Sequence, residues 1–100
     1  MSPKTNRRPV FKFRLYVAGD SQNSVEAVAN LTAICRQYLP DLYNIEVMDV
    51  FLHPARAVTD GIFMTPTLVK IAPAPTRTII GNLSQTGVVL QALGLEASVA

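Results

Sequence analysis

The side chains best suited to chemistry in this sequence are few and scattered. Cys35 is the single cysteine and His53 the single histidine among 100 residues. Thiol redox chemistry usually pairs two cysteines, and a metal site needs several nitrogen, sulfur or carboxylate ligands at suitable spacing. One cysteine excludes both an internal disulfide framework and a CxxC redox centre, and no second ligand stands at metal-binding spacing from His53. The sequence therefore predicts no redox centre and no metal site.

Carboxylate and hydroxyl side chains offer little more. Asp49 lies in an apolar stretch, where burial could shift its pKa towards a functional value, but a carboxylate at a strand end more often bonds to a neighbouring loop. Ser21 and Ser24 have no histidine or lysine near them in sequence to act as a base, so we interpret them as turn and cap residues. Phosphate-binding motifs of the GxxxxGKS and GxGxxG types are absent. We expect no enzymatic activity and no cofactor.

The composition is typical of a single folded domain. Apolar residues make up 49% and charged residues 16% of the chain, and the mean hydropathy is +0.26, which excludes an intrinsically disordered protein. No apolar run approaches the ~20 residues of a membrane-spanning helix, and the polar start does not resemble a signal peptide. We expect a cytoplasmic protein with a basic disordered arm at 1–9, one domain at 10–95 and a short tail at 96–100.

The positive charges are concentrated near the start of the chain. Five of the nine lysines and arginines precede the first acidic residue, Asp20. Such a cluster fits either a nucleic-acid or acidic partner, or a solvated tail followed by one polar strand face. No basic surface interleaved with aromatic residues follows, which favours the second interpretation. We expect no nucleic-acid partner and no membrane partner.

The first half of the chain has the pattern of a βαβ unit. Strict alternation over 10–17 predicts a strand with Phe11, Phe13, Leu15 and Val17 on one face. Asn23 is the predicted N-cap of an amphipathic helix that ends before Pro40, and Glu26 is its predicted capping-box partner. Residues 43–51 form a second predicted strand, and its apolar residues on both faces suggest a central position in a mostly parallel sheet.

The second half is predicted to add a helix, a hairpin and a final helix. Pro54 suits the first position of a short helix that ends near Gly61. Strands at 67–71 and 76–80 are separated by a four-residue, proline-containing turn. A last helix runs from a cap at Ser84 through Leu93, and Gly94 follows it as a helix stop. This segment also holds Gly87, Val88 and Val89, which disfavour a helix, and such a conflict argues against a single deep energy well.

The resulting order, βαβαββα, is that of the α/β thioredoxin-like fold. Pro66 stands just before the third predicted strand, where thioredoxins place a cis-proline. The start of the first helix, where thioredoxin chemistry needs a thiolate, instead holds residues 19–24, which include no cysteine. Cys35 follows more than a dozen residues later on the apolar stripe of that helix, so we interpret it as an inert core residue.

Four motifs in register resemble the KaiB family of cyanobacterial circadian clock proteins. The resemblance covers roughly residues 11–93. The motifs are Leu15-Tyr16-Val17-Ala18-Gly19 with Asn23-Ser24, Val47-Met48-Asp49-Val50, Thr65-Pro66-Thr67-Leu68-Val69-Lys70, and the run from Pro73-Ala74-Pro75 through Ile79-Ile80-Gly81-Asn82-Leu83-Ser84. Any one of them alone would be a weak match, whereas four in order are specific.

The resemblance implies a binding protein without catalytic activity. KaiB binds the N-terminal ATPase ring of KaiC, sequesters KaiA and competes with the kinase SasA. It also switches from a tetrameric ground state of order βαββααβ to a thioredoxin-like binding state. By this resemblance Lys70 and Arg77 are partner-binding residues, and a homo-oligomer, tetramer or dimer, is expected. The expected conformational-switch residues are Pro66, Pro73, Pro75, Ala92 and Gly94.

This sequence also departs from the family pattern. Gly61 stands where a lysine that contributes to KaiC binding is common, Glu26 where a basic residue is common, and Asn82 in place of an aspartate. Ala92 and Gly94 depart from a Gly-Leu-Asp run. These differences suggest a divergent KaiB homologue or one from outside the core clock. An alternative function is a SasA-like sensory module or a thioredoxin-like stress-response module without CxxC chemistry.

Overall fold

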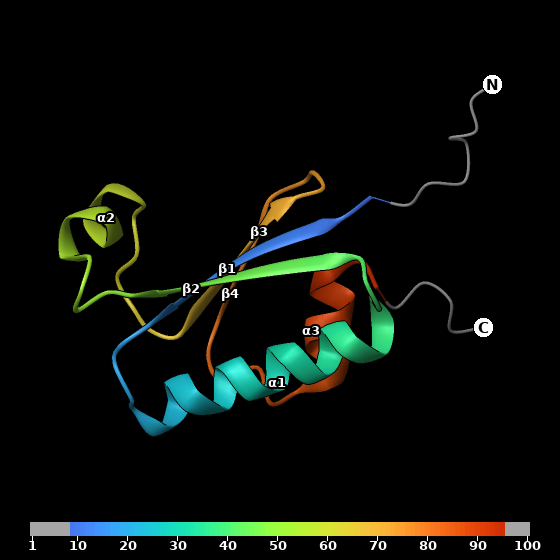
Figure 1. Cartoon of the computed structure of the whole chain (residues 1–100), viewed down its shortest axis with the longest axis horizontal. Coiled ribbons are helices and arrows are strands. Elements are labelled where there is room, and N and C mark those ends of the chain that lie inside the picture. Colours follow the sequence, from blue (N-terminus) through green and yellow to red (C-terminus); the bar gives the residue numbers. More distant parts are fainter. Residues whose placement is uncertain (1–8, 96–100) are drawn as a thin grey trace.

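A four-stranded sheet forms the centre of the computed structural model, which describes residues 9–95 (Figure 1). The strand order is β2-β1-β3-β4; β1 and β2 are parallel, and the other two pairings are antiparallel. The elements in chain order are β1 (Phe11–Val17), α1 (Gln22–Tyr38), β2 (Tyr43–Asp49), α2 (Pro54–Thr59), β3 (Thr67–Ala72), β4 (Arg77–Ile80) and α3 (Thr86–Leu93). This confirms the predicted βαβαββα order. The predicted arm, apart from Pro9, and the predicted tail lie outside the described residues.

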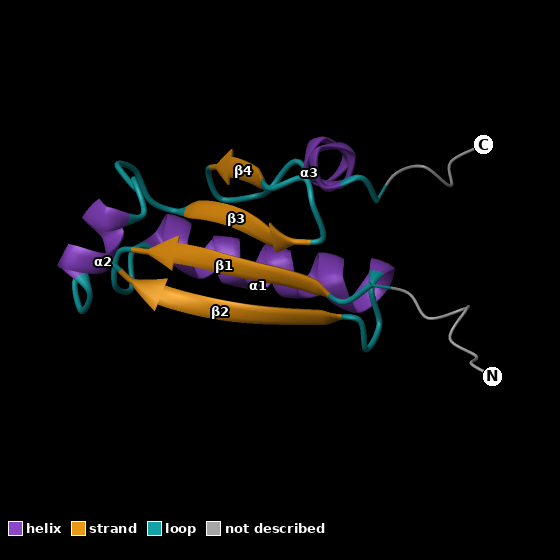
Figure 2. Ribbon diagram, turned by 90° about the horizontal axis from the view of Figure 1, so that it is seen from above, coloured by secondary structure: helices purple, strands orange, loops and turns teal. Residues whose placement is uncertain are grey.

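The core lies between the sheet and two helices. Phe13, Leu15 and Val17 alternate on one face of β1 and are buried, as the sequence pattern predicts. Leu31 of α1 and Leu93 of α3 pack against this face and are almost inaccessible to solvent. Figure 1 shows α1 and α3 on the same side of the sheet. The opposite sheet face carries no helix along its length (Figure 2).

The prediction of β2 as a central strand of a mostly parallel sheet is wrong. β2 lies at the edge, paired with β1 alone, and only one of the three strand pairings is parallel. Val47 lies opposite Leu15 on the face that α1 covers but is 48% exposed at the sheet edge, whereas Met48 lies opposite Tyr16 on the other face and is buried. Apolar residues on both faces of β2 therefore do not indicate a central strand, because Ile45 packs against the core on one face and Met48 is buried on the other while β2 itself stays at the edge.

The first helix begins earlier than predicted. Ser21, not Asn23, is the N-cap residue, and its hydroxyl oxygen accepts a hydrogen bond from the Ser24 amide at 3.3 Å. Serine caps a helix as well as asparagine does, so Ser21 can serve as the cap two residues before Asn23. Glu26 makes no capping box; its carboxylate accepts hydrogen bonds from Gln22 and Asn82.

The final helix forms despite its unfavourable residues. Val89, Leu90 and Leu93 are buried against the core, and this packing outweighs the low helix propensity of the valines. Gly94 ends α3 in the left-handed conformation at φ 76°, and its amide donates to the Gln91 carbonyl at 3.2 Å. Within residues 9–95 no helix is long and apolar enough to cross a bilayer.

Candidate partner-binding surface

Two cations face each other across the β3–β4 ladder. Lys70 pairs in register with Arg77 on one side and with Phe13 of β1 on the other. Opposed residues share a sheet face, so Lys70 lies on the face that α1 and α3 cover. Its side chain is 5% exposed, and its Nζ lies 5.5 Å from the centre of the Phe11 ring. Arg77 is exposed at the start of the edge strand.

These two cations lack a counter-charge within residues 9–95. Burial, followed by the nearby charge of Arg77, lowers the pKa of Lys70. The ion pairs of the described chain are all made by Arg14 and Arg56. The Phe11 ring offers Lys70 a modest electrostatic contact, worth about 0.5–2 kcal/mol in such geometries. A carboxylate supplied from outside would therefore meet two uncompensated positive charges.

The start of α1 is a hydrogen-bonded turn that carries serines and no cysteine. Ser24 is buried, and its Oγ accepts hydrogen bonds from the Ala18 amide at 3.1 Å and the Ser21 hydroxyl at 2.8 Å. Asp49 Oδ1 accepts from the amides of Gly19 at 3.2 Å and Phe51 at 2.9 Å. Asp49 thus holds the two adjoining loops together, which is the structural role favoured from its position at a strand end.

Cys35 is a core residue. Its side chain is inaccessible to solvent within α1, and burial raises the pKa of its thiol to about 12. Because the thiolate is the nucleophile, a thiol held protonated at neutral pH is poorly reactive. The structure thus confirms that Cys35 is a buried residue of the core.

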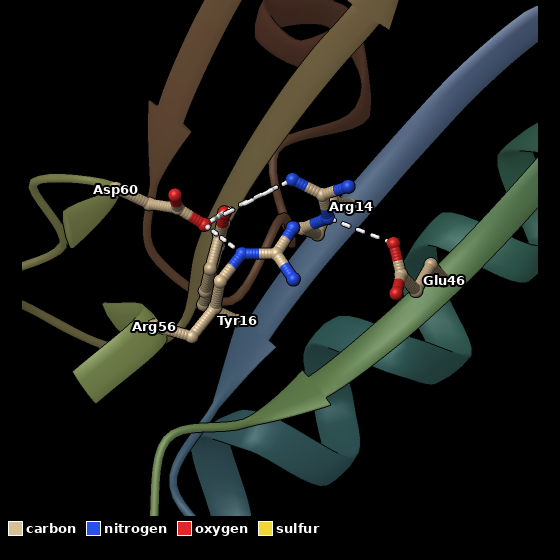
Figure 3. A network of polar contacts seen from close by, with 5 residues as sticks. All are labelled: Arg14, Tyr16, Glu46, Arg56 and Asp60. Carbon is tan, nitrogen blue, oxygen red and sulfur yellow. Dashed lines mark hydrogen bonds and ion pairs between the residues drawn. The ribbon is translucent and has the colours of Figure 1, made fainter. Parts of the chain in front are cut away.

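A polar network that the sequence analysis did not identify joins α2 to the open sheet face (Figure 3). The Tyr16 hydroxyl donates to Asp60 Oδ2 at 2.6 Å, and Arg56 Nε donates to the same oxygen at 3.0 Å. Arg14 Nε donates to Glu46 at 2.8 Å, and its Nη1 lies 3.9 Å from Asp60. The hydrogen bond from Tyr16 is the main reason that the pKa of Asp60 is lowered. In the sequence, the alternation that places Arg14 and Tyr16 together on the polar face of β1 was the available signal for part of this network.

A second set of contacts ties the loop before α3 to α1. Asn82 Nδ2 donates to Glu26 at 3.0 Å, and Asn30 donates to the Asn82 carbonyl at 2.8 Å. Leu83 follows in the left-handed region at φ 64° while its side chain is 4% exposed. A left-handed backbone is costly for a branched residue, so the burial of Leu83 and these contacts must hold the turn together.

The residues expected to form a conformational switch occupy three places. Pro66 precedes β3, and Pro73 and Pro75 lie in the turn between β3 and β4; all three follow cis peptide bonds. Ala92 and Gly94 lie at the end of α3. The structure brings Pro73 and Pro75 near the Lys70–Arg77 pair along the hairpin but leaves Pro66 at the opposite end of β3. A switching role for these residues remains a prediction.

Comparison with known proteins leads to the same family that the sequence motifs resemble. A family model described as the KaiB domain matches residues 14–95. The circadian clock protein KaiB3 of Synechocystis is 47% identical over 83 residues, which cover 83% of this chain and 79% of that protein. The circadian clock oscillator protein KaiB of Nostoc is 44% identical over 88 residues, which cover 88% of this chain and 82% of that protein.

Solved structures show the same fold at much lower sequence identity. The N-terminal domain of SasA from Synechococcus elongatus superposes with a TM-score of 0.71 at 20% identity and covers 100% of this chain and 97% of that domain. Mitochondrial thioredoxin 3 of Saccharomyces cerevisiae superposes with a TM-score of 0.68 at 18% identity and covers 88% and 81%. The fold is therefore thioredoxin-like.

Proposed function

Because the chain belongs to the KaiB family of circadian clock proteins, we propose that it is a non-enzymatic module that docks on the ATPase ring of a KaiC-type protein. Docking would regulate the phosphorylation state of that ATPase. The observation that carries the proposal is the Lys70–Arg77 pair, which has no counter-charge within residues 9–95. An acidic surface on the ring supplies the missing charge.

Arg77 and Lys70 contribute to docking in different ways. Arg77 is exposed and can bind a carboxylate directly with its planar guanidinium group. Lys70 is nearly buried, so its main contribution is to strengthen the local positive potential beside Arg77. We further propose that the chain reaches this thioredoxin-like state by a fold switch in the segment from Pro66 to Gly94, and that KaiA and a homo-oligomeric ground state belong to the same cycle.

A second candidate function is a role in a SasA-type kinase pathway. It is favoured by the superposition of the whole chain on the SasA N-terminal domain. A module of this kind would compete with that domain for the same ring. Competition and regulation of the ATPase are separable, because only the second changes the phosphorylation of a KaiC homologue when no kinase is present.

Binding to a purified KaiC homologue, with and without ATP, tests the main proposal. We expect Arg77→Glu to weaken docking about tenfold or more and to reduce its dependence on salt, because an attractive charge becomes a repulsive one. Arg36→Glu is the matched control, since Arg36 is also exposed but lies at the end of α1. Equal loss in both variants, or no loss in Arg77→Glu, would refute the assignment of the surface.

A further inference from the structure

The short helix α2 is held to the domain by little apolar burial. Ala57 is its one buried residue, and Val58 is 74% exposed. Leu52 and Phe63, in the loops on either side of α2, are also exposed. A helix of six residues is not stable in water by itself. Contacts with the sheet must therefore hold α2 in place, and hydrophobic burial supplies few of them.

Two buried residues lie on the open sheet face at the end that carries α2. Tyr16 and Met48 are opposite each other in the β1–β2 pairing, and they are 2% and 6% exposed. Neither belongs to the core that α1 and α3 cover. Tyr16 lines a groove of about 500 Å³ together with Asp60 and Phe63. Among the described elements α2 is the helix at this end of the open face (Figure 2), so α2 and its flanking loops cover both residues.

Bonds to one carboxylate oxygen join α2 to the sheet. Asp60 directly follows α2, and its Oδ2 accepts hydrogen bonds from the Tyr16 hydroxyl at 2.6 Å and from Arg56 Nε at 3.0 Å. Arg14 Nη1 lies 3.9 Å from the same oxygen. Tyr16 and Arg14 belong to β1 and Arg56 belongs to α2, so the helix and the strand meet at this atom (Figure 3). Within residues 9–95 no other ion pair joins α2 or the loop after it to the sheet.

From the sparse burial of α2 and the bonds that meet at Asp60, we infer that residues 51–64 form a flap that opens while the rest of the domain stays folded, and that Asp60 holds it closed. The flap is fixed at both ends: the Val50 amide donates to the Val17 carbonyl at 2.8 Å, and β3 begins at Thr67. A segment with few buried contacts opens at a lower free energy than the whole domain unfolds.

Opening of the flap changes the open sheet face. In the closed state residues 60–64 line the groove together with Thr78 and Ile80 of β4. In the open state this groove is lost, and Tyr16 and Met48 become accessible. The flap thus sets which surface the open face presents. This inference rests on the fold alone and not on the proposed function.

Oxidation of methionine by hydrogen peroxide, followed by peptide mass spectrometry, tests the flap. Peroxide transfers one oxygen atom to an accessible thioether, which gives the sulfoxide and water. Met64 is 59% exposed in the closed state and serves as the internal reference, whereas Met48 is buried and should react only through opening. We expect Asp60→Ala to raise the oxidation rate of Met48 relative to Met64 about tenfold, because hydrogen bonds to a charged group no longer oppose opening. Glu46→Gln is the matched control, since Glu46 also binds Arg14 but lies on β2, outside the flap.

Tyr16→Phe removes the same hydrogen bond from the strand side and keeps the aromatic ring. It should speed hydrogen–deuterium exchange of the Ala57 and Ile62 amides about fivefold, because a detached six-residue helix does not keep its hydrogen bonds. Amides of α1 and α3 should exchange as in the wild-type chain. An unchanged Met48 rate in Asp60→Ala, or unchanged exchange in Tyr16→Phe, would overturn the inference. So would an equal acceleration in α1 and α3, because the whole domain would then be opening. All measurements use the chain alone, so a failure of the proposed docking on a KaiC-type protein would leave them unaffected.

Discussion

Replacing Gly87 by alanine should stabilise the thioredoxin-like state. Gly87 is the second residue of α3, its backbone is not left-handed, and no atom lies within 4 Å of the position that an added Cβ would take. Alanine restricts the unfolded chain and creates no clash, so the free energy of unfolding should rise by about 0.4–1 kcal/mol. For a domain of this size that corresponds to an increase in melting temperature of roughly 2–8 °C.

The same substitution at the other end of α3 should act in the opposite direction. Gly94 has φ 76°, a conformation that costs an alanine about 1–2 kcal/mol. Gly94→Ala should therefore lower the melting temperature, although it too replaces glycine by alanine at an unobstructed position. Thermal and urea unfolding, followed by circular dichroism, measure both variants under identical conditions.

A failure of this contrast would refute the reasoning. If Gly87→Ala left the unfolding midpoint unchanged or lowered it, residues 86–93 would not be helical in the dominant state. If the chain exchanges with the βαββααβ state, Gly87→Ala should also shift the two populations about two- to fivefold towards the thioredoxin-like one. Backbone chemical shifts of residues 86–93 report that shift directly.

Three further predictions concern the core and the loops. The free energy of unfolding should fall as the pH rises from about 9 towards 12, because burial raises the pKa of the Cys35 thiol to about 12 and the thiol of the unfolded chain ionises first. Urea unfolding of Cys35→Ala should lack this contribution. If the stability of Cys35→Ala fell as steeply with pH as that of the wild-type chain, the prediction would be contradicted. Cys35→Ser should leave insulin reduction in dithiothreitol at the level of the no-protein control, as in the wild-type chain, whereas a wild-type rate above that control would show a reactive thiol. Asp49→Ala should lower the free energy of unfolding by about 1–2 kcal/mol, because the amides of Gly19 and Phe51 lose their acceptor. Asp49→Asn keeps an acceptor oxygen and should retain most of the stability. Similar losses in both variants would assign the effect to the charge of Asp49.

Sequence patterns predicted the element order because each element carries its own local signal. Alternation identified β1, three- and four-residue spacing identified α1, and a terminal glycine identified the end of α3. The edge position of β2 was not predictable in this way. Which strands pair is decided by packing between distant segments, and the apolar faces of Val47 and Met48 are equally compatible with a central strand.

The candidate sites were less accessible to sequence reasoning than the fold. Lys70 and Arg77 were named from a family resemblance, but the burial of Lys70 follows only from its register opposite Phe13. The Tyr16–Asp60 hydrogen bond joins residues 44 positions apart, and no local pattern indicates such a contact. The apolar hollow lined by Phe51, Phe63 and Met64 forms where the loops on either side of α2 meet, so neither loop reveals it alone.

Hydrogen–deuterium exchange of the chain bound to an ATP-loaded KaiC homologue tests the central claim most directly. Docking through the Lys70–Arg77 surface in the thioredoxin-like state should slow exchange across β4, and α3 should remain protected as a helix. Arg77→Glu should remove the protection of β4 under conditions in which Arg36→Glu retains it. The account would be contradicted if no complex formed with ATP, or if a complex formed in which β4 exchanged as fast as in the free chain.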